Sequence, residues 1–284
     1  MKFNRATAQV FIPDGLRDRK ALKRTTHMAI AAHQDDIEIM AIDGILKCFH
    51  QQGQWFTGVV VTDGAGSPRD GLYQDYSDQQ MREVRVVEQK KAAILGEYAV
   101  QVFLDYPSSI VKSPNNLDPV EDLQDLLEAT QPEIVYTHNL ADKHPTHVAV
   151  SLCAIQAIRA LPQMARPKKL YGCEVWRDLG WLLDEDKVVF DCSSHENLQV
   201  ALLGVYDSQI SGGKRYDLAT MGRRRAHATY YASHEVDAMT GMVVGMDLTP
   251  LIQNPSLDIQ EFVQLFIDHF SEDVHHIIDN VGRI

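Results

Sequence analysis

The hydrophobic pattern of the chain alternates between short β-rich runs and longer segments of helical period. Each run ends in a polar turn, and apolar residues then recur at the spacing of one helix face. The expected strands are residues 27–32, 55–62, 99–104, 133–138 and 169–176, and the expected helices are residues 36–52, 78–96, 119–130 and 145–161. This order is typical of βαβ units, so it predicts an α/β fold around a parallel sheet.

The alternation fades after Glu174. Residues 187–192 have the pattern of an edge or antiparallel strand, and residues 196–206 and 257–270 have the pattern of helices. The segments between them show no clear period. We therefore expect the C-terminal part to elaborate the α/β core rather than to repeat it.

The length of 284 residues suits one large domain or two small ones, and its core needs no disulfides for stability. Neither an internal repeat nor a low-complexity linker divides the chain, so we expect a single domain over residues 1–284. Its motif-bearing core covers about residues 25–176, and its C-terminal elaboration covers about residues 177–284. The four cysteines lack CxxC spacing, which favours a reducing, cytoplasmic location.

Charge and hydropathy exclude several classes of partner. The chain carries 27 basic and 39 acidic side chains, and its net charge of −12 disfavours binding to nucleic acid or to an anionic membrane surface. No run approaches the ~18–20 apolar residues that span a bilayer, so we expect no stable membrane insertion. Two basic runs, residues 17–24 and 223–225, are expected to be solvated faces.

The stretch IAAHQDDIE places a histidine and three acids directly after the first buried strand. In open α/β sheets, ligands bind beyond the carboxyl ends of the strands. His33 and Asp36 are three residues apart, so a helical turn would point both side chains the same way and leave Asp35 aimed elsewhere. Two metal ligands and a separate base would result. Alternatively, the two aspartates only cap the following helix, where negative charge contributes ~0.3–1 kcal/mol.

A second cluster follows the strand at residues 133–138. The loop after this strand carries four residues of metal-ligand type: His138, Asp142, His144 and His147. Three ligands of histidine and carboxylate type, with one position open to water, are typical of a catalytic zinc site. The metal ion of such a site lowers the pKa of a bound water molecule. A nearby carboxylate can accept the proton of this water, and a nearby histidine can stabilise the oxyanion that forms. The two clusters together predict a metal-dependent hydrolase.

Both clusters resemble motifs of the LmbE-like or PIG-L-like zinc-dependent N-acetylglucosaminyl deacetylases. That family has AHPDDE after its first strand and HPDH after a later one, and this chain has AHQDDI at residues 32–37 and HPTH at residues 144–147. Residues 85–96 resemble the family's RxxExxxA…LG helix, and residues 206–209 resemble a weaker SQ signature. The resemblance covers about residues 25–160. It implies a Rossmann-like sheet of mostly parallel strands flanked by helices, with a C-terminal elaboration.

The resemblance also implies roles for the motif residues. His33, Asp36 and His147 would bind Zn²⁺, although Fe²⁺ and Mn²⁺ are compatible with the same ligands. Asp35 would be the general base, and His144 would stabilise the tetrahedral intermediate.

Substrate contacts are implied for Arg85 and Ser108. Arg85 would reach the substrate or the departing acetate, and the alternative is an intrahelical partnership with Glu88. Ser108 stands where the family has an acid that grips a sugar hydroxyl. Gln34 replaces the proline of the first motif, which loosens the turn and removes no chemistry.

Two further departures concern residues around the metal ligands. Ile37 replaces the glutamate of the first motif, and Glu38 would take over a supporting role. Thr146 replaces the aspartate of HPDH, so that His144 would lose a partner unless Asp142 replaces it from the loop.

The implied function is removal of the N-acetyl group from an N-acetylglucosamine-containing small molecule or glycoconjugate, giving free amine and acetate. The expected partner is a small amino-sugar substrate, and the resemblance is compatible with a homo-oligomer. An alternative is a catalytically weakened metal- or carbohydrate-binding protein on the same fold. A nucleotide-binding domain is disfavoured, because the glycine-rich loop at residues 62–67 matches neither a dinucleotide nor a P-loop motif. We expect that loop to lie beside the site, whereas Trp176 and His227 could either approach it or pack elsewhere.

Overall fold

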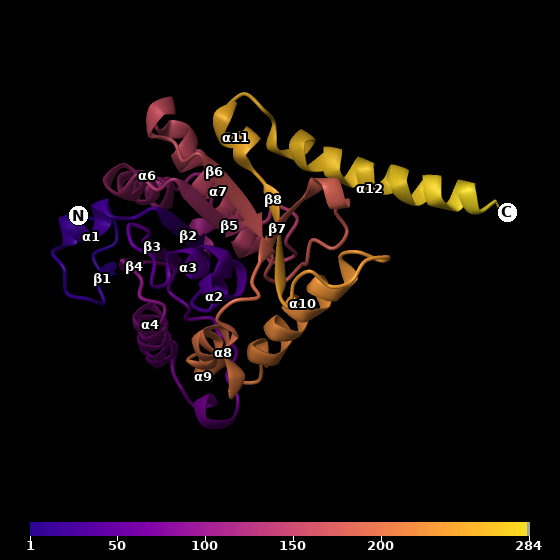
Figure 1. The fold of residues 1–284 in the computed structure, drawn as a ribbon. Coiled ribbons are helices and arrows are strands. Elements are labelled where there is room, and N and C mark those ends of the chain that lie inside the picture. The colour runs from indigo at the N-terminus through magenta and orange to yellow at the C-terminus, as the bar shows by residue number, and fades with distance from the viewer. Residues whose placement is uncertain (283–284) are drawn as a thin grey trace.

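The computed structural model describes residues 1–282. Its centre is an eight-stranded sheet with the order β1-β4-β3-β2-β5-β6-β8-β7 (Figure 1). The strands are β1 (Gln9–Phe11), β2 (His27–Ala31), β3 (Phe56–Thr62), β4 (Val100–Tyr106), β5 (Ile134–His138), β6 (Lys169–Cys173), β7 (Lys187–Asp191) and β8 (Met242–Asp247). The five strands from β4 to β6 in this order run parallel, whereas β1, β8 and β7 pair antiparallel with their neighbours.

Helices cover both faces of the sheet. The α-helices are α1 (Asp18–Lys23), α2 (Asp36–Met40), α3 (Ile42–Cys48), α4 (Asp78–Leu95), α5 (Ser108–Val111), α6 (Asp118–Thr130), α7 (Pro145–Ala160), α8 (Glu196–Gly204), α9 (Asp207–Ile210), α10 (Tyr216–Tyr230), α11 (Thr249–Gln253) and α12 (Ile259–Val281). Short 3₁₀ turns occupy Gly71–Tyr73, Gln163–Ala165 and Asp184–Asp186. Helices α1, α6, α7 and α11 pack on one side, and α2, α3, α4 and α8 pack on the other, giving two apolar cores.

The strand order reverses at β2. The chain leaves β2 for β3 on one side, whereas β5 lies on the other side, paired in parallel with His27 opposite Ile134. All five side chains of β2 are buried, as expected for a parallel strand covered on both faces. The carboxyl ends of β2 and β5 therefore meet at a topological switch point, which is the ligand-binding position of open α/β sheets.

The predicted α/β fold and its five parallel strands are confirmed, and one predicted helix is wrong in detail. Residues 36–52 form two helices, α2 and α3, that are separated at Ala41. The side chain of Arg224 reaches the end of α2 and donates hydrogen bonds to the carbonyls of Glu38 (2.7 Å) and Ile39 (3.3 Å). These carbonyls would accept bonds from the next turn of a continuous helix, so the arginine stabilises the break. Arg224 is buried, which corrects the expectation that residues 223–225 form a solvated face.

The C-terminal part contributes to the same sheet. Strand β7 is an antiparallel edge strand, as its pattern predicted, and the unpredicted β8 lies between β7 and β6. Helix α12 continues well beyond residue 270, where the sequence pattern ended it, and it extends away from the sheet (yellow in Figure 1). Its first turns pack on the core through Phe262, whereas Ile277 and Ile278 are about half exposed. Within residues 1–282, no helix combines the length and hydropathy that a bilayer crossing requires.

Candidate metal centre and active site

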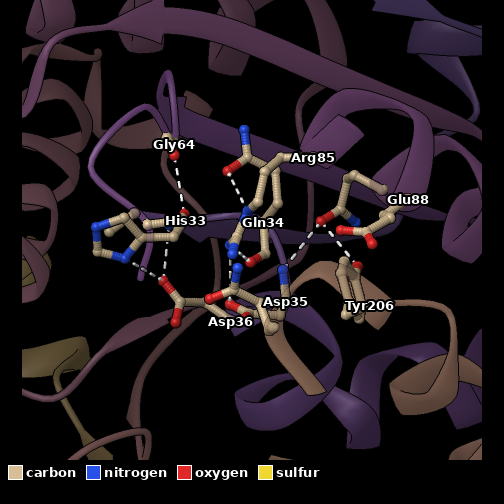
Figure 2. Close-up of polar contacts among 12 residues, drawn as sticks. His33, Gln34, Asp35, Asp36, Gly64, Arg85, Glu88 and Tyr206 are labelled. Carbon is tan, nitrogen blue, oxygen red and sulfur yellow. Dashed lines mark hydrogen bonds and ion pairs between the residues drawn. The ribbon is translucent and has the colours of Figure 1, made fainter. Parts of the chain in front are cut away.

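The residues of the two sequence clusters meet at the carboxyl ends of β2 and β5. The turn after β2 carries His33, Asp35 and Asp36, and the loop and first turn of α7 carry His144 and His147 (Figure 2 shows the first turn). The backbone N–H of His33 donates to Asp36 Oδ2 at 2.7 Å, which ties the turn to the start of α2. The switch point of the sheet thus brings together groups more than a hundred residues apart.

Three donor atoms form a compact triangle. His33 Nδ1 lies 3.1 Å from Asp36 Oδ2 and 3.1 Å from His147 Nε2, and the third edge, from His147 Nε2 to Asp36 Oδ2, is 3.4 Å. A tetrahedral zinc ion with bonds of ~2.0–2.1 Å separates its ligand atoms by about 3.3 Å. The three predicted ligands therefore fit a tetrahedral metal ion with one position left for water or substrate.

His138 also lies close to this triangle, with its Nε2 3.6 Å from Asp36 Oδ2. However, the backbone N–H of Ala32 donates to this Nε2 at 2.8 Å, so the nitrogen's lone pair is already in use. The ring instead stacks on His147, with centroids 3.9 Å apart. His138 therefore packs beneath the triangle and is a poorer ligand than His33.

Asp142 fixes the orientation of His147. Its Oδ2 lies 3.4 Å from His147 Nδ1, so an N–H on that nitrogen would leave the Nε2 lone pair facing the triangle. The same carboxylate accepts the backbone N–H groups of His144 (2.8 Å) and Trp176 (3.1 Å). Asp142 therefore does not replace the missing partner of the His144 ring, because the loop brings only the backbone of His144 to this carboxylate. Of the two alternatives, the described residues show the lost partner, since His144 Nδ1 makes no hydrogen bond within them.

Burial and mutual charge set the protonation of the cluster. Burial opposes ionisation of Asp36, but His147 and His33 hold its pKa well below its ordinary value. Burial likewise opposes protonation of His147, but Asp36 and Asp142 raise its pKa. For His144, burial and the neighbouring imidazoles lower the pKa to about 4. His144 is therefore neutral near pH 7.

Asp35 occupies a strained position beside the triangle. Its φ of 94° lies in a region that residues other than glycine rarely adopt. Its backbone N–H donates to the Gln89 side chain at 3.3 Å, and its Oδ1 lies 3.5 Å from the guanidinium of Arg85. Burial raises the pKa of Asp35 to about 8, even though Arg85 acts in the opposite direction. Its carboxylate forms no capping bond to α2, so the alternative interpretation as a helix cap does not describe it.

Arg85 reaches the site from α4 (Figure 2). Its guanidinium donates to the backbone carbonyl of Gln34 and lies 3.4 Å from the Gln34 side-chain oxygen. Gln34 therefore does more than loosen the turn, since it anchors the arginine. Glu88 instead accepts the backbone N–H (2.7 Å) and hydroxyl (2.6 Å) of Ser208, from the SQ segment. Arg85 thus points to the site rather than pairing with Glu88.

Glu38 lies in the buried layer behind Asp35, whereas Ile37 packs in an apolar core. The carboxylate of Glu38 accepts hydroxyl groups from Tyr98 (2.6 Å) and Tyr206 (2.5 Å). It also accepts the Gln89 amide at 2.9 Å, so Gln89 links Glu38 to the Asp35 backbone. Burial raises the pKa of Glu38 to about 7.

Sequence reasoning missed Gln89. It lies four residues after Arg85 in α4, so both side chains share one helix face, and this spacing was the available signal.

A pocket of about 390 Å³ opens above the triangle. Ser108 and the glycine-rich loop at residues 62–67 line it, as expected, and Thr146 and Trp176 also form part of its wall. Three lining residues come from the C-terminal part: Gln209, Lys214 and Tyr216. Gln209 belongs to the SQ signature, for which the sequence suggested no place in the site, and sequence reasoning missed Lys214 and Tyr216. His227 is not among the lining residues and lies 3.1 Å from Glu174.

Comparison with solved structures confirms the predicted fold. The N,N'-diacetylchitobiose deacetylase of Pyrococcus horikoshii is similar with a TM-score of 0.62 and 18% identity, covering 84% of this chain and 88% of that one. The 4-carboxy-2-hydroxymuconate hydratase GalB of Pseudomonas putida has a TM-score of 0.61 and 17% identity, and the match covers 79% of this chain and 95% of that one. A conserved protein of Thermus thermophilus has a TM-score of 0.57 and 19% identity, and the match covers 82% of this chain and 98% of that one. At these identities the likeness establishes the fold alone.

Sequence comparison establishes the family. Residues 28–158 match the PIG-L family, described as GlcNAc-PI de-N-acetylase. The uncharacterized deacetylase YaiS of Escherichia coli K12 is 30% identical over 149 residues, which are 51% of this chain and 74% of that protein. The matched region contains both strand-end clusters and the α4 helix. The chain therefore belongs to the PIG-L (LmbE-like) deacetylase family.

Proposed function

We propose that this protein is a metal-dependent hydrolase that removes the N-acetyl group from an N-acetylglucosamine-containing small molecule or glycoconjugate. The observation that carries the proposal is the triangle of His33, Asp36 and His147 donor atoms, with the carboxylate of Asp35 beside it. The deacetylase family supports the reaction, and the family description and the diacetylchitobiose deacetylase support an acetamido sugar as substrate.

His33, Asp36 and His147 would hold the metal ion. Two imidazoles and one carboxylate suit Zn²⁺, and Fe²⁺ and Mn²⁺ are compatible with the same donors. When bound, the ion supplies positive charge that polarises the amide carbonyl and acidifies water.

Asp35 and His144 would divide the proton transfer and charge stabilisation. In its ionised form, which the charge of Arg85 favours, Asp35 takes a proton from the attacking water. The proton then goes to the amide nitrogen as the C–N bond breaks, so that the products are a free amine and acetate. A neutral His144 ring donates a hydrogen bond to the oxygen that becomes negative in the tetrahedral intermediate. Its low pKa keeps it neutral in the absence of substrate.

Arg85 and Ser108 would bind and position the substrate. The guanidinium of Arg85 lies between Gln34 and Asp35, where its charge favours the ionised form of the base and attracts the departing acetate. Ser108 lines the pocket and offers a hydroxyl to the sugar.

Acetate release from a panel of N-acetylglucosamine conjugates tests the proposal. Zinc-reconstituted protein is expected to release acetate, the chelated protein is not, and Asp35→Asn is expected to lose at least about a hundredfold in kcat. Unchanged acetate release by Asp35→Asn would contradict the role of this base. Binding of metal and sugar without acetate release would favour the carbohydrate-binding alternative.

A further inference from the structure

Three lysine side chains lie in or beside the pocket of this acidic protein. Lys112 and Lys214 line the pocket, and Lys143 lies next to it in the loop that precedes His144. Building on the proposed function, we propose that the natural substrate carries an anionic group, a carboxylate or a phosphate, adjacent to its N-acetyl sugar. These three lysines would bind that group.

The three lysines come from segments that are distant in the sequence. Lys112 ends α5, Lys143 lies between β5 and α7, and Lys214 lies in the turn between α9 and α10. Lys143 and Lys214 both approach the Trp176 ring, and Lys112 lines the same pocket as Lys214. A substrate anion in this pocket would be attracted by these charges.

Trp176 connects these charges to the reacting centre. Its ring stacks beside His144, with centroids 6.4 Å apart and planes inclined by 18°. Lys214 Nζ lies 5.2 Å and Lys143 Nζ lies 5.6 Å from the centroid of the Trp176 ring. Such cation–π contacts orient the two ammonium groups. The ammonium groups of Lys143 and Lys214 therefore lie about one aromatic side chain away from His144, which would stabilise the intermediate.

The turn that presents Lys214 has a constrained backbone. Gly213 has a φ of +108°, and a Cβ at Gly212 would collide with the carbonyl oxygen of Ser208. The backbone N–H of Lys214 donates to the Gln209 carbonyl at 2.8 Å. The two glycines thus allow a tight turn that carries Lys214 to the pocket wall.

Protein carboxylates do not neutralise these lysines. Across residues 1–282, none of the three forms an ion pair within 4.0 Å, although acidic residues outnumber basic ones. Elsewhere, Lys168 pairs with Glu133 at 2.7 Å. The pocket also contains the carboxylates of Asp35, Asp36 and Asp63. Asp35 and Asp36 belong to the candidate metal and base site, and Asp63 Oδ1 accepts the backbone N–H of Ala65 at 3.1 Å. Unpaired cations facing a pocket favour an anionic ligand and exclude a cationic one.

The size of the pocket limits the substrate. Its volume of about 390 Å³ is near the lower end of the ~300–1,000 Å³ of small-molecule sites. One sugar with a small substituent suits that volume better than a long oligosaccharide. We therefore expect the anionic group to be part of the small substituent that is attached to the sugar.

The test compares three substrates that differ only at the anomeric oxygen of N-acetylglucosamine: a methyl, a carboxymethyl and a phosphate derivative. With the zinc-reconstituted protein, we expect kcat/KM at low ionic strength to be about tenfold higher for an anionic derivative than for the methyl derivative. Added salt is expected to reduce this ratio. The carboxymethyl and phosphate arms identify which anion is preferred.

Lysine variants then test the assignment. Lys214→Ala is expected to lower the anionic-to-neutral ratio by about three- to tenfold, and combination with Lys112→Ala lowers it further. Lys168→Ala is the matched control, because this lysine lies before the amino end of β6 and is paired with Glu133. This control is expected to keep the native ratio.

Binding of the same compounds to zinc-loaded Asp35→Asn protein, measured by calorimetry, separates this inference from the proposed function. Tighter binding of the anionic derivatives, together with no hydrolysis by the native protein, would support the anion site and contradict the deacetylase proposal. Equal kcat/KM values and equal Kd values for charged and neutral derivatives would overturn the anion site while leaving the deacetylase proposal intact.

Discussion

At the scale of single residues, the site depends on side chains that hold the reactive groups in place. Asp35 has a strained backbone, and a strained residue persists only when its surroundings restrain it. Gln89 supplies one restraint, because its side chain accepts the Asp35 N–H while its amide donates to Glu38. Gln89 is therefore a positioning residue for the proposed base.

Gln89→Met is expected to lower kcat by about ten- to a hundredfold, with a smaller change in KM. Methionine has a similar length but no strong acceptor, so the Asp35 N–H loses its partner and the carboxylate loses its orientation. Steady-state kinetics and zinc content check this result. Gln79→Met, at an exposed position of the same helix, is the control. A change in thermal stability alone, with native kcat, would show that Gln89 supports only the fold.

At the scale of elements, the break between α2 and α3 depends on α10. Arg224 lies in α10 and donates to carbonyls at the end of α2, and it also donates to the Gln199 side chain at 2.9 Å. Burial lowers the pKa of Arg224 to about 10, so it remains charged at neutral pH. Because α2 begins at Asp36, this contact also supports a candidate metal ligand.

Arg224→Met is expected to lower the free energy of unfolding by about 2–4 kcal/mol, because the α2 carbonyls lose charged donors within the interior. Arg225→Met provides a matched control at the next position. Arg225 is exposed and pairs with Glu196 on the surface, so its loss is expected to change stability by less than about 1 kcal/mol. Urea denaturation of both variants measures the difference. Equal effects would show that the buried contact contributes little.

At the scale of the whole molecule, the C-terminal part completes the sheet and the pocket. Strand β8 pairs with both β6 and β7, and the segment before it supplies Gln209, Lys214 and Tyr216 to the pocket. The outer part of α12 differs, since its apolar side chains are substantially exposed.

Two truncations test this difference. A chain that ends at Phe270 is expected to keep its thermal midpoint within a few degrees, since it loses only exposed turns of α12. A chain that ends at Thr240 is expected not to fold cooperatively, because it lacks β8 and leaves β7 without its partner. Thermal unfolding followed by circular dichroism checks both. Cooperative unfolding of the shorter chain would show that the remaining strands fold without β8.

The sequence by itself determined the alternation of strands and helices and the location of both polar clusters at strand ends. Both features follow from local physics, because residue periodicity selects helix or strand and a polar turn ends each buried run. The expected helical alignment of His33 and Asp36 is wrong, since α2 begins only at Asp36 and a non-helical turn brings the two side chains together. The tertiary structure decided that Asp142 contacts His147, that Gln89 supports Asp35, and that Arg224 interrupts a helix. The Arg224 contact joins residues 186 positions apart, and no local pattern specifies such a pairing. Those choices depend on how the packed sheet and helices place distant donors and acceptors, since a buried polar group must find a partner wherever the fold provides one.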